Sequence, residues 1–282
     1  MALSSVTLTR AADLPTADPE SLGFSAERLA RIAPAIQREI AAGQYPGAVM
    51  LVARNGRIVY FDSVGQLDPA GGKPMTKDAI FRLYSMTKPY TSVAIMMLME
   101  EGKLRVTGPV SRYLPALANL QVSVEKTDPY TGAAKYLNVP VDREINIQDL
   151  LRHTSGMVYA GYTAHPKVRE LYTKEGVDWK DVTPAEQIER LAKVPLAHQP
   201  GTTTLPAGTG FGLGFAVRKE TGRFEVTGNA GEYYWAGAAG TGFYVDPKEG
   251  IICVSMTQAQ PGIARRYDRY LFKQMVYQAI AK

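Results

Sequence analysis

Ser85 and Lys88 are the pair of residues in this chain whose types and spacing best suit covalent catalysis. On a helix, residues three apart share one face, so their side chains can meet. A serine hydroxyl is a weak nucleophile until a base removes its proton, and a lysine amine can do this when burial or a positive potential lowers its pKa. The spacing therefore predicts that Ser85 attacks a carbonyl carbon and that Lys88 accepts the hydroxyl proton.

The same Ser-x-x-Lys pattern occurs at Ser123 and Lys126, so the pattern alone is weak. A chain of this length and average composition contains about one such match by chance. Ser123 lies in a polar stretch, whereas Ser85 precedes an apolar run and stands where a helix would begin. A helix N-terminus supplies positive potential and N–H groups for an oxyanion. Context favours Ser85, although spacing alone leaves open a helix-capping serine beside a surface lysine.

Other catalytic and ligand-binding patterns are weaker. The sequence has no Gly-x-Ser-x-Gly motif, which an α/β-hydrolase nucleophile would need. His153, His165 and His198 lack the spacing of a zinc site, so we expect structural or surface histidines, no metal and no cofactor. The glycine-rich run 208–214 precedes a strand-like segment, whereas phosphate-binding loops open a helix.

The elements that must position these residues follow from hydrophobic spacing. Helices are expected over about 25–42, 85–101, 145–152, 184–193 and 265–281. The helix over 85–101 is rich in apolar residues and is expected to be buried. Strands are expected over 48–54, 57–61, 212–218, 223–227, 240–246 and 251–256. The first two strands meet at Asn55-Gly56, which predicts a hairpin turn.

Strand-like segments lie at both ends of the chain, and a polar, loop-rich stretch with short helices lies between them. We therefore expect an α+β fold, in which N- and C-terminal segments share one antiparallel sheet flanked by helices. Residues 1–104 and 210–282 form the expected sheet domain, with residues 1–17 as a poorly ordered arm. Residues 105–209 form an inserted, mainly helical and loop region.

Composition argues against several classes of function. The 282 residues include 32 Lys and Arg against 27 Asp and Glu, and the basic residues are scattered rather than clustered as in a nucleic-acid-binding surface. The longest apolar run, 93–99, is far shorter than the roughly 20 residues of a membrane-spanning helix. The single cysteine, Cys253, cannot form an internal disulfide. We expect a cytoplasmic protein without nucleic-acid or membrane partners.

Five segments in order carry a further signal. They are Phe81-Arg-Leu-Tyr-Ser85-Met-Thr-Lys88, Asp149-Leu-Leu-Arg-His-Thr-Ser-Gly156-Met, Gln199-Pro-Gly-Thr, Gly212-Leu-Gly-Phe-Ala-Val and Glu232-Tyr-Tyr-Trp-Ala-Gly-Ala-Ala-Gly-Thr-Gly-Phe-Tyr-Val-Asp-Pro. Together they resemble the β-lactamase-related serine hydrolases, which include class C β-lactamases, D,D-peptidases and family VIII carboxylesterases. The resemblance runs from about Asp18 to Ile280, and motifs in context are more specific than one pattern. It implies a β-lactamase/transpeptidase-like fold with Ser85 as the nucleophile.

In that family the serine is acylated, a lysine and a tyrosine share proton transfer, and a Lys-Thr-Gly or substitute motif lines the pocket. Here the motif reads Trp235-Ala236-Gly237, which looks more like the esterase branch. A lysine would meet a substrate carboxylate and tryptophan cannot, so neutral esters are the expected substrates. By family analogy, the N–H groups of Ser85 and Ala238 form the oxyanion hole. The alternative for Trp235 is an ordinary packed aromatic side chain.

The chain departs from this family after its Pro-Gly-Thr turn. Relatives carry a catalytic tyrosine there, followed by roughly a hundred residues of helical domain. Here Pro206 stands at the tyrosine position and the chain runs almost directly to Phe211. A segment is therefore missing after Thr204, either by deletion or by omission from this sequence. Tyr159 and Tyr162 follow the His-Thr-Ser-Gly turn and are the candidate substitutes.

Three functions remain as hypotheses. The first is a carboxylesterase that hydrolyses small acyl esters through an acyl-enzyme. The second keeps the acyl-enzyme but acts on β-lactams or peptidoglycan peptides. The third is a catalytically impaired binding protein, because the family tyrosine is absent and a fold does not by itself imply an activity. A small-molecule ester or amide is the expected partner, and nothing in the sequence indicates the oligomeric state.

Overall fold

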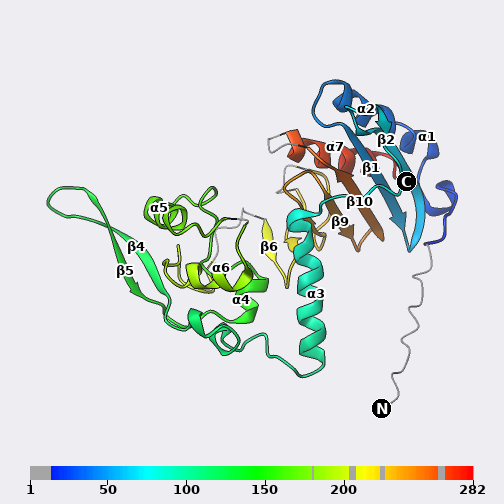
Figure 1. Cartoon of the computed structure of the whole chain (residues 1–282). Helices are drawn as coiled ribbons and strands as arrows, with labels where there is room; N and C mark the ends of the chain where they lie inside the picture. The colour runs from blue at the N-terminus through cyan, green and yellow to red at the C-terminus, as the bar shows by residue number, and fades with distance from the viewer. Residues whose placement is uncertain (1–13, 180, 203–207, 223–225, 260–263, 282) are drawn as a thin grey trace, which may run out of the picture. The chain divides into compact units, whose positions relative to one another are not determined.

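The computed structural model describes residues 14–179, 181–202, 208–222, 226–259 and 264–281 (Figure 1). These residues divide into two compact units. The first unit combines Met1–Thr87 with Val217–Lys282, and the second unit is Lys88–Ala216. Segments from both ends of the chain therefore build one unit.

A large antiparallel sheet forms the centre of the first unit. Its strands follow the order β3-β2-β1-β10-β9-β8-β7. Their bounds are β1 (Gly47–Arg54), β2 (Arg57–Asp68), β3 (Lys73–Pro74), β7 (Ala216–Arg218), β8 (Tyr233–Ala236), β9 (Gly242–Asp246) and β10 (Ile251–Thr257). The N-terminal strand β1 pairs with the C-terminal strand β10, with Met50 opposite Ser255. This pairing confirms the expected α+β plan.

The first hairpin forms where the sequence places it. Asn55 and Gly56 link β1 to β2, and both have positive φ angles, +50° and +75°. Asparagine and glycine tolerate this conformation well, which suits the tight turns that join twisted strands. The β2 strand continues to Asp68, beyond the predicted end at residue 61.

Helices pack on the sheet of the first unit. They are η1 (Glu20–Leu22), α1 (Ala26–Leu29), α2 (Ile32–Ala41), η2 (Tyr84–Met86) and α7 (Ala264–Gln278), of which η1 and η2 are 3-10 turns. Helix α7 contacts α1, α2 and β10, and Figure 1 shows it running along the sheet. The core between these layers contains Phe24, Ile32, Ile36, Met50, Val52, Ile251, Phe272 and Val276.

The helix predicted over 25–42 is divided in two. Its break falls at Ala30 and Arg31, between α1 and α2. Pro34 lies in the first turn of α2, and its ring nitrogen has no hydrogen to donate to a carbonyl one turn earlier. The single predicted helix was therefore wrong, because proline is tolerated at a helix start but not in a helix interior.

Two further differences concern strands and the N-terminus. The strand predicted over 212–218 is confined to β7, and a separate strand β6 (Thr209–Phe211) precedes it. Residues 223–225 of the strand predicted over 223–227 lie outside the described residues. Within the expected N-terminal arm, the Ala17 amide donates to the Ile58 carbonyl at 2.9 Å, and the Ile58 amide donates to the Pro15 carbonyl at 2.8 Å.

The second unit contains helices and a long hairpin. Its elements are α3 (Thr87–Glu100), η3 (Val110–Arg112), η4 (Pro115–Leu117), β4 (Gln121–Thr127), β5 (Ala134–Pro140), α4 (Ile147–Leu151), α5 (Pro166–Glu175), α6 (Pro184–Leu191) and β6. The β4–β5 hairpin extends as a two-stranded ribbon (Figure 1). Sequence reasoning expected only loops and short helices there, because this stretch is polar.

Helix α3 differs from its expected burial. In α3, Pro89 and Ser92 are buried, whereas Val93 and Met97 are about half exposed, at 50% and 55%. The reason is that the helix carries apolar side chains on all of its faces, whereas the second unit covers only part of its surface. Gly214 illustrates the covered side, since a Cβ added there would lie 2.3 Å from the Ser92 hydroxyl oxygen. No helix in the described part of the chain has the length and hydropathy needed to cross a bilayer.

Candidate active site

Ser85 lies in the 3-10 turn η2, and Lys88 lies in the first turn of α3. The backbone runs from one element directly into the other, and both side chains are partly buried. Ser85 belongs to the first unit and Lys88 to the second. The serine therefore stands at a helix start, as the sequence predicts.

The second Ser-x-x-Lys match has a different local structure. Ser123 and Lys126 lie in strand β4. Side chains three residues apart on a strand point to opposite faces, so these two cannot form a catalytic pair. Ser123 serves the fold instead, since its carbonyl faces Nε2 of His165 at 3.0 Å. His165 also accepts the amide of Val168 at Nδ1 and thereby caps α5.

The residue before Ser85 has an unusual backbone conformation. Tyr84 has a φ angle of +50°, in the left-handed region that residues with a Cβ seldom adopt. Such a conformation costs about 1–3 kcal/mol and persists only where surrounding contacts impose it. Strained residues of this kind occur preferentially at functional sites. The turn that carries Ser85 is therefore held in place by the structure around it.

Thr241 and Gly237 hold this turn from the sheet side. The buried hydroxyl of Thr241 donates to the carbonyl of Leu83 at 3.0 Å. A Cβ at Gly237 would lie 2.1 Å from that same carbonyl oxygen and 2.2 Å from the Thr241 hydroxyl oxygen. Only glycine fits at this position, so the glycine of the Trp-Ala-Gly motif is required by close packing against the Ser85 turn.

The loop after β8 carries Ala238, whose amide is expected from the sequence to be the second oxyanion donor. Gly237 donates its amide to the Thr241 carbonyl at 2.8 Å, and Gly240 donates to the Gly237 carbonyl at 3.2 Å. These bonds use neither polar group of Ala238, which is exposed at the tip of the loop. The structure thus brings the loop that carries Ala238 against the turn that carries Ser85.

Trp235 and Ala236 precede this loop on strand β8. Trp235 lies opposite Phe243, and Ala236 lies opposite Gly242, on the neighbouring strand β9. Both side chains are partly buried. This degree of exposure agrees with a pocket wall and also with the alternative of a packed aromatic residue for Trp235.

The two candidate tyrosines differ in their relation to Lys88. The ammonium nitrogen of Lys88 lies 6.0 Å from the centre of the Tyr159 ring. The Tyr159 and Tyr162 rings form a T-shaped pair, and Tyr162 is 86% exposed, against 54% for Tyr159. Of the two, Tyr159 is therefore the one that the structure brings next to the candidate base. The Pro206 position, where relatives carry their tyrosine, lies outside the described residues.

His153 is a neighbour of Lys88 that the sequence analysis expected to be a structural or surface residue. Its backbone has a φ of +55°, and its ring stacks on Phe211 with 4.4 Å between centroids. Atoms around the ring exclude water from it, and the positive charge of Lys88 adds to this effect, so the pKa of His153 is lowered. The imidazole is therefore neutral near pH 7. No local pattern in the sequence pairs His153 with Phe211, so sequence reasoning could not find this contact.

Asp149 fixes the loop that contains His153 and Tyr159. Its buried carboxylate accepts two bonds from Arg143, at 2.6 and 2.8 Å, and one from the Asn146 amide at 2.9 Å. Thr154 donates its hydroxyl to the same carboxylate at 3.2 Å. Burial alone would raise the pKa of Asp149, but the bonds from Arg143 and Asn146 outweigh it and hold the pKa below its usual value.

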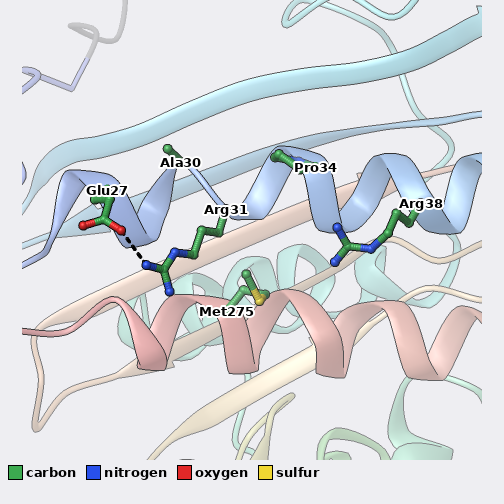
Figure 2. Close-up of a pocket in the computed structure, with 6 residues that line it drawn as sticks. All are labelled: Glu27, Ala30, Arg31, Pro34, Arg38 and Met275. Atoms are coloured by element: carbon green, nitrogen blue, oxygen red, sulfur yellow. Dashed lines mark hydrogen bonds and ion pairs between the residues drawn. The ribbon is translucent and has the colours of Figure 1, made fainter.

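A surface groove of the first unit lies elsewhere. Figure 2 shows that α1, α2 and α7 line it through Glu27, Ala30, Arg31, Pro34, Arg38 and Met275. Its volume is about 510 Å³. Arg31 pairs with Glu27 at 2.5 Å, and the lining includes no serine, cysteine or tyrosine. This groove therefore does not contain a nucleophile.

Among the residues that the structure describes, no group of three or more His, Cys, Asp or Glu could hold a metal ion.

Two curated proteins are similar in sequence to much of this chain. Esterase EstB of Burkholderia gladioli is 32% identical over 187 residues, covering 66% of this chain and 44% of that protein. N-acetylmuramyl-L-alanine amidase of Bacillus subtilis is 33% identical over 214 residues, covering 72% and 43%. The chain thus spans less than half the length of these curated relatives.

A solved structure supports the fold assignment. EstCE1, described as a hydrolase with promiscuous acyltransferase activity, superposes with a TM-score of 0.71 at 20% identity. The superposition covers 92% of this chain and 99% of that chain. At this identity the likeness concerns the fold alone.

The beta-lactamase family model matches residues 32–205. This match confirms the resemblance that the five motifs indicate, and the chain belongs to the β-lactamase family of serine hydrolases.

Proposed function

We propose that this protein is a carboxylesterase that hydrolyses small acyl esters through an acyl-enzyme. Ser85 attacks the ester carbonyl carbon, and Lys88 accepts the serine proton. The amides of Ser85 and Ala238 stabilise the oxyanion that develops on the carbonyl oxygen. Water then attacks the acyl-enzyme, which releases the acid and restores the serine.

The close approach of Gly237 to Leu83 carries this proposal. It brings the Ala238 loop against the turn of Ser85, and two amide donors must converge for an oxyanion hole. The left-handed backbone of Tyr84 adds a second argument, because strain before a reactive residue indicates a constrained site. Both features lie within the first unit.

Residues of the second unit supply the proposed proton transfers. Lys88 must act in its amine form, and the neutral His153 beside it adds no second positive charge. Tyr159 is proposed to pass its phenol proton to the leaving alkoxide and to regain a proton from Lys88, which has taken it from Ser85, because the Tyr159 ring lies next to the Lys88 Nζ atom. A positioned general acid of this kind contributes about 10²–10⁴-fold in rate.

The substrate class follows from the residue at the head of the Trp-Ala-Gly motif. Trp235 cannot form an ion pair with a substrate carboxylate, so the site favours neutral esters over β-lactams and peptides that end in a carboxylate. A second candidate substrate is an amide or peptidoglycan peptide, because the B. subtilis relative is named an amidase. A third candidate function is a binding protein with impaired catalysis, because proline stands at position 206 where relatives carry their tyrosine.

A burst experiment tests the proposal. Mixing the protein with p-nitrophenyl acetate should release one equivalent of p-nitrophenol rapidly, and intact mass should show one acetyl group on Ser85. The Ser85→Ala variant should lose both signals. The Ser123→Ala variant is the matched control and should retain them, because Ser123 lies in β4. Equal turnover by Ser85→Ala and the unmodified protein would remove Ser85 from the mechanism.

Two further probes separate the alternatives. Hydrolysis of nitrocefin faster than that of short-chain esters would favour the β-lactam or peptidoglycan candidate. A fluorophosphonate should label Ser85 in either enzyme, since it reacts with activated serines. Absence of labelling in the folded protein would favour the binding protein.

A further inference from the structure

Arg269 of α7 contacts both ends of the loop that carries Ala238. Its Nη1 donates to the Gly237 carbonyl and to the Thr241 carbonyl, each at 3.3 Å. Its stem packs on the start of β9, because a Cβ at Gly242 would lie 2.7 Å from the Arg269 Cδ atom. One guanidinium group of α7 therefore contacts the loop at two points.

The first of these bonds, to the Gly237 carbonyl, determines the direction of the Ala238 amide. The Gly237 carbonyl and the Ala238 N–H belong to the same peptide group. In a planar trans peptide, C=O and N–H point in opposite directions. A bond that holds the Gly237 carbonyl toward Arg269 therefore holds the Ala238 N–H away from α7. Rotation of this peptide group would remove the donor from the oxyanion hole without changing any catalytic side chain.

Glycine makes such a rotation easy. Gly237 has no Cβ, so the backbone on one side of this peptide group has wide conformational freedom. The bond from the Gly240 amide to the Gly237 carbonyl lies inside a short, glycine-rich loop, so it does not fix that carbonyl relative to the rest of the unit. Arg269 supplies a donor from outside the loop, and a longer-range anchor of this kind restricts the conformations available to it.

The second bond connects Arg269 to the nucleophile turn. Arg269 holds the Thr241 carbonyl, which also accepts the Gly237 amide at 2.8 Å. The hydroxyl of the same threonine donates to the Leu83 carbonyl. One arginine therefore supports the chain of bonds that fixes the Ala238 loop against the turn of Ser85.

The other end of β8 has an independent anchor on the same helix. Lys273, one turn after Arg269, forms an ion pair with the buried Glu232, which directly precedes β8. Loss of the Arg269 side chain therefore leaves the strand attached to α7 through Lys273. The expected consequence is a change in the loop rather than unfolding of the strand.

We propose that Arg269 is a positioning residue that keeps the Ala238 amide directed into the oxyanion hole. The inference rests on the proposed function, since it needs Ser85 to form an acyl-enzyme. In this role the Arg269 side chain acts through the peptide backbone, by its bonds to the Gly237 and Thr241 carbonyls. Its removal should therefore reduce kcat more than it raises KM, because the oxyanion forms only in the transition state.

The test compares Arg269→Met with Arg54→Met. Both arginines are half-buried, belong to the first unit and donate to backbone carbonyls. Arg54 binds the carbonyls of Leu22 at 2.9 Å and of Glu249 at 2.9 Å, neither of which belongs to the loop or the Ser85 turn. Arg54→Met is therefore the control for the loss of a structural arginine.

Arg269→Met should lower kcat for p-nitrophenyl acetate by about 10- to 100-fold. This is less than the loss of about 10²–10³-fold expected when an oxyanion donor is deleted, because the Ala238 amide is misdirected rather than removed. KM should change by less than about 3-fold, while Arg54→Met keeps kcat within about 2-fold. Arg269→Lys, which retains one donor and a positive charge, should recover part of kcat. Wild-type kcat in a folded Arg269→Met protein would overturn the inference and leave the proposed function intact.

Two other outcomes are also decisive. If Arg269→Met does not fold, Arg269→Gln, whose side chain is shorter and uncharged, decides, since wild-type kcat in that folded variant would overturn the inference and a several-fold loss with unchanged KM would support it. If the unmodified protein forms no acyl-enzyme, both the proposed function and the role of Arg269 fail. The acetyl mass on Ser85 in the unmodified protein therefore separates the two failures.

Discussion

Thr241 donates its hydroxyl to the carbonyl of Leu83 at 3.0 Å, across 158 positions of the sequence. Leu83 stands two residues before Ser85, and the Thr241 side chain is fully buried. The same carbonyl accepts the Met86 amide at 3.1 Å. One threonine thus joins the end of the sheet to the turn that presents the candidate nucleophile.

Thr241→Val should separate this bond from simple packing. Valine has nearly the same shape but no donor, and loss of one hydrogen bond costs about 0.5–1.5 kcal/mol of stability. A small displacement of the Ser85 turn should lower kcat by about 10-fold or more. Ester hydrolysis and urea unfolding measure the two effects. Thr241→Ser keeps the hydroxyl and is the control. Equal kcat in both variants would show that the bond does not position Ser85.

Gly237→Ala should damage both stability and activity. The added Cβ would come within 2.1 Å of the Leu83 carbonyl, a backbone atom that cannot move without displacing the Ser85 turn. Overpacking of this kind costs about 1–3 kcal/mol. Gly161→Ala is the stability control, because nothing lies within 4 Å of the added Cβ and its φ is not positive. Its unfolding free energy should stay within about 0.5 kcal/mol of the parent. An unchanged unfolding midpoint and kcat in Gly237→Ala would contradict the close packing.

Local signals in the sequence predicted several elements well. Asn55-Gly56 predicted the first hairpin, because both residues adopt positive φ at little cost. The segment 145–152 contains α4, where Asn146 and Asp149 form a reciprocal capping box. Strands at both ends of the chain predicted the shared sheet, because pairing satisfies their backbone hydrogen bonds and gives the helices one apolar face to cover.

Features that depend on distant contacts were not predictable. Tyrosine has no preference for positive φ, so the strain at Tyr84 comes from surroundings that the sequence does not encode locally. The β4–β5 hairpin is largely exposed, and the apolar alternation in β4 is limited to Val122 and Val124, too short to mark a strand in a polar stretch. Helix α3 shows the reverse case, since its apolar composition predicted burial that the second unit does not provide.

The site was predictable in part for the same reason. The motif residues Ser85, Lys88 and Gly237 stand out by type and spacing. Their supports Thr241 and Arg269 do not, because each acts through a backbone carbonyl far away in the sequence. A threonine between two glycines after the Trp-Ala-Gly motif was the one available signal for Thr241.

Tyr159→Phe should slow ester hydrolysis more strongly when the leaving group of the ester is more basic. An alkoxide needs a proton as it departs, whereas p-nitrophenolate leaves without one, so the loss should be about 10²-fold for ethyl acetate and much smaller for p-nitrophenyl acetate. Tyr162→Phe is the matched control, since Tyr162 is 86% exposed and the Lys88 ammonium faces the Tyr159 ring. A Tyr159→Phe loss that is equal for both esters would exclude proton donation by this phenol.

The Asp149 carboxylate makes the stability of its loop depend on acid. The pKa of Asp149 is lowered in the folded protein, so the folded state holds the proton more weakly than the unfolded state. Such a group contributes stability that is complete above the unfolded pKa of about 3.9 and is lost as the pH falls through the lower folded pKa. Asp149→Asn removes this contribution at every pH.

The difference in unfolding free energy between the parent and Asp149→Asn should therefore be constant above about pH 5 and shrink below about pH 4. At pH 7 we expect about 1–3 kcal/mol, the range for a buried group that loses hydrogen bonds to a charged partner. Arg143→Met is the companion variant, because it removes two of the donors that lower this pKa and should shift the acid loss to higher pH. Urea unfolding at pH 3, 4, 5 and 7 measures all three proteins. A parent–variant difference that is the same at pH 3 and pH 7 would show that ionised Asp149 does not stabilise the loop of His153 and Tyr159.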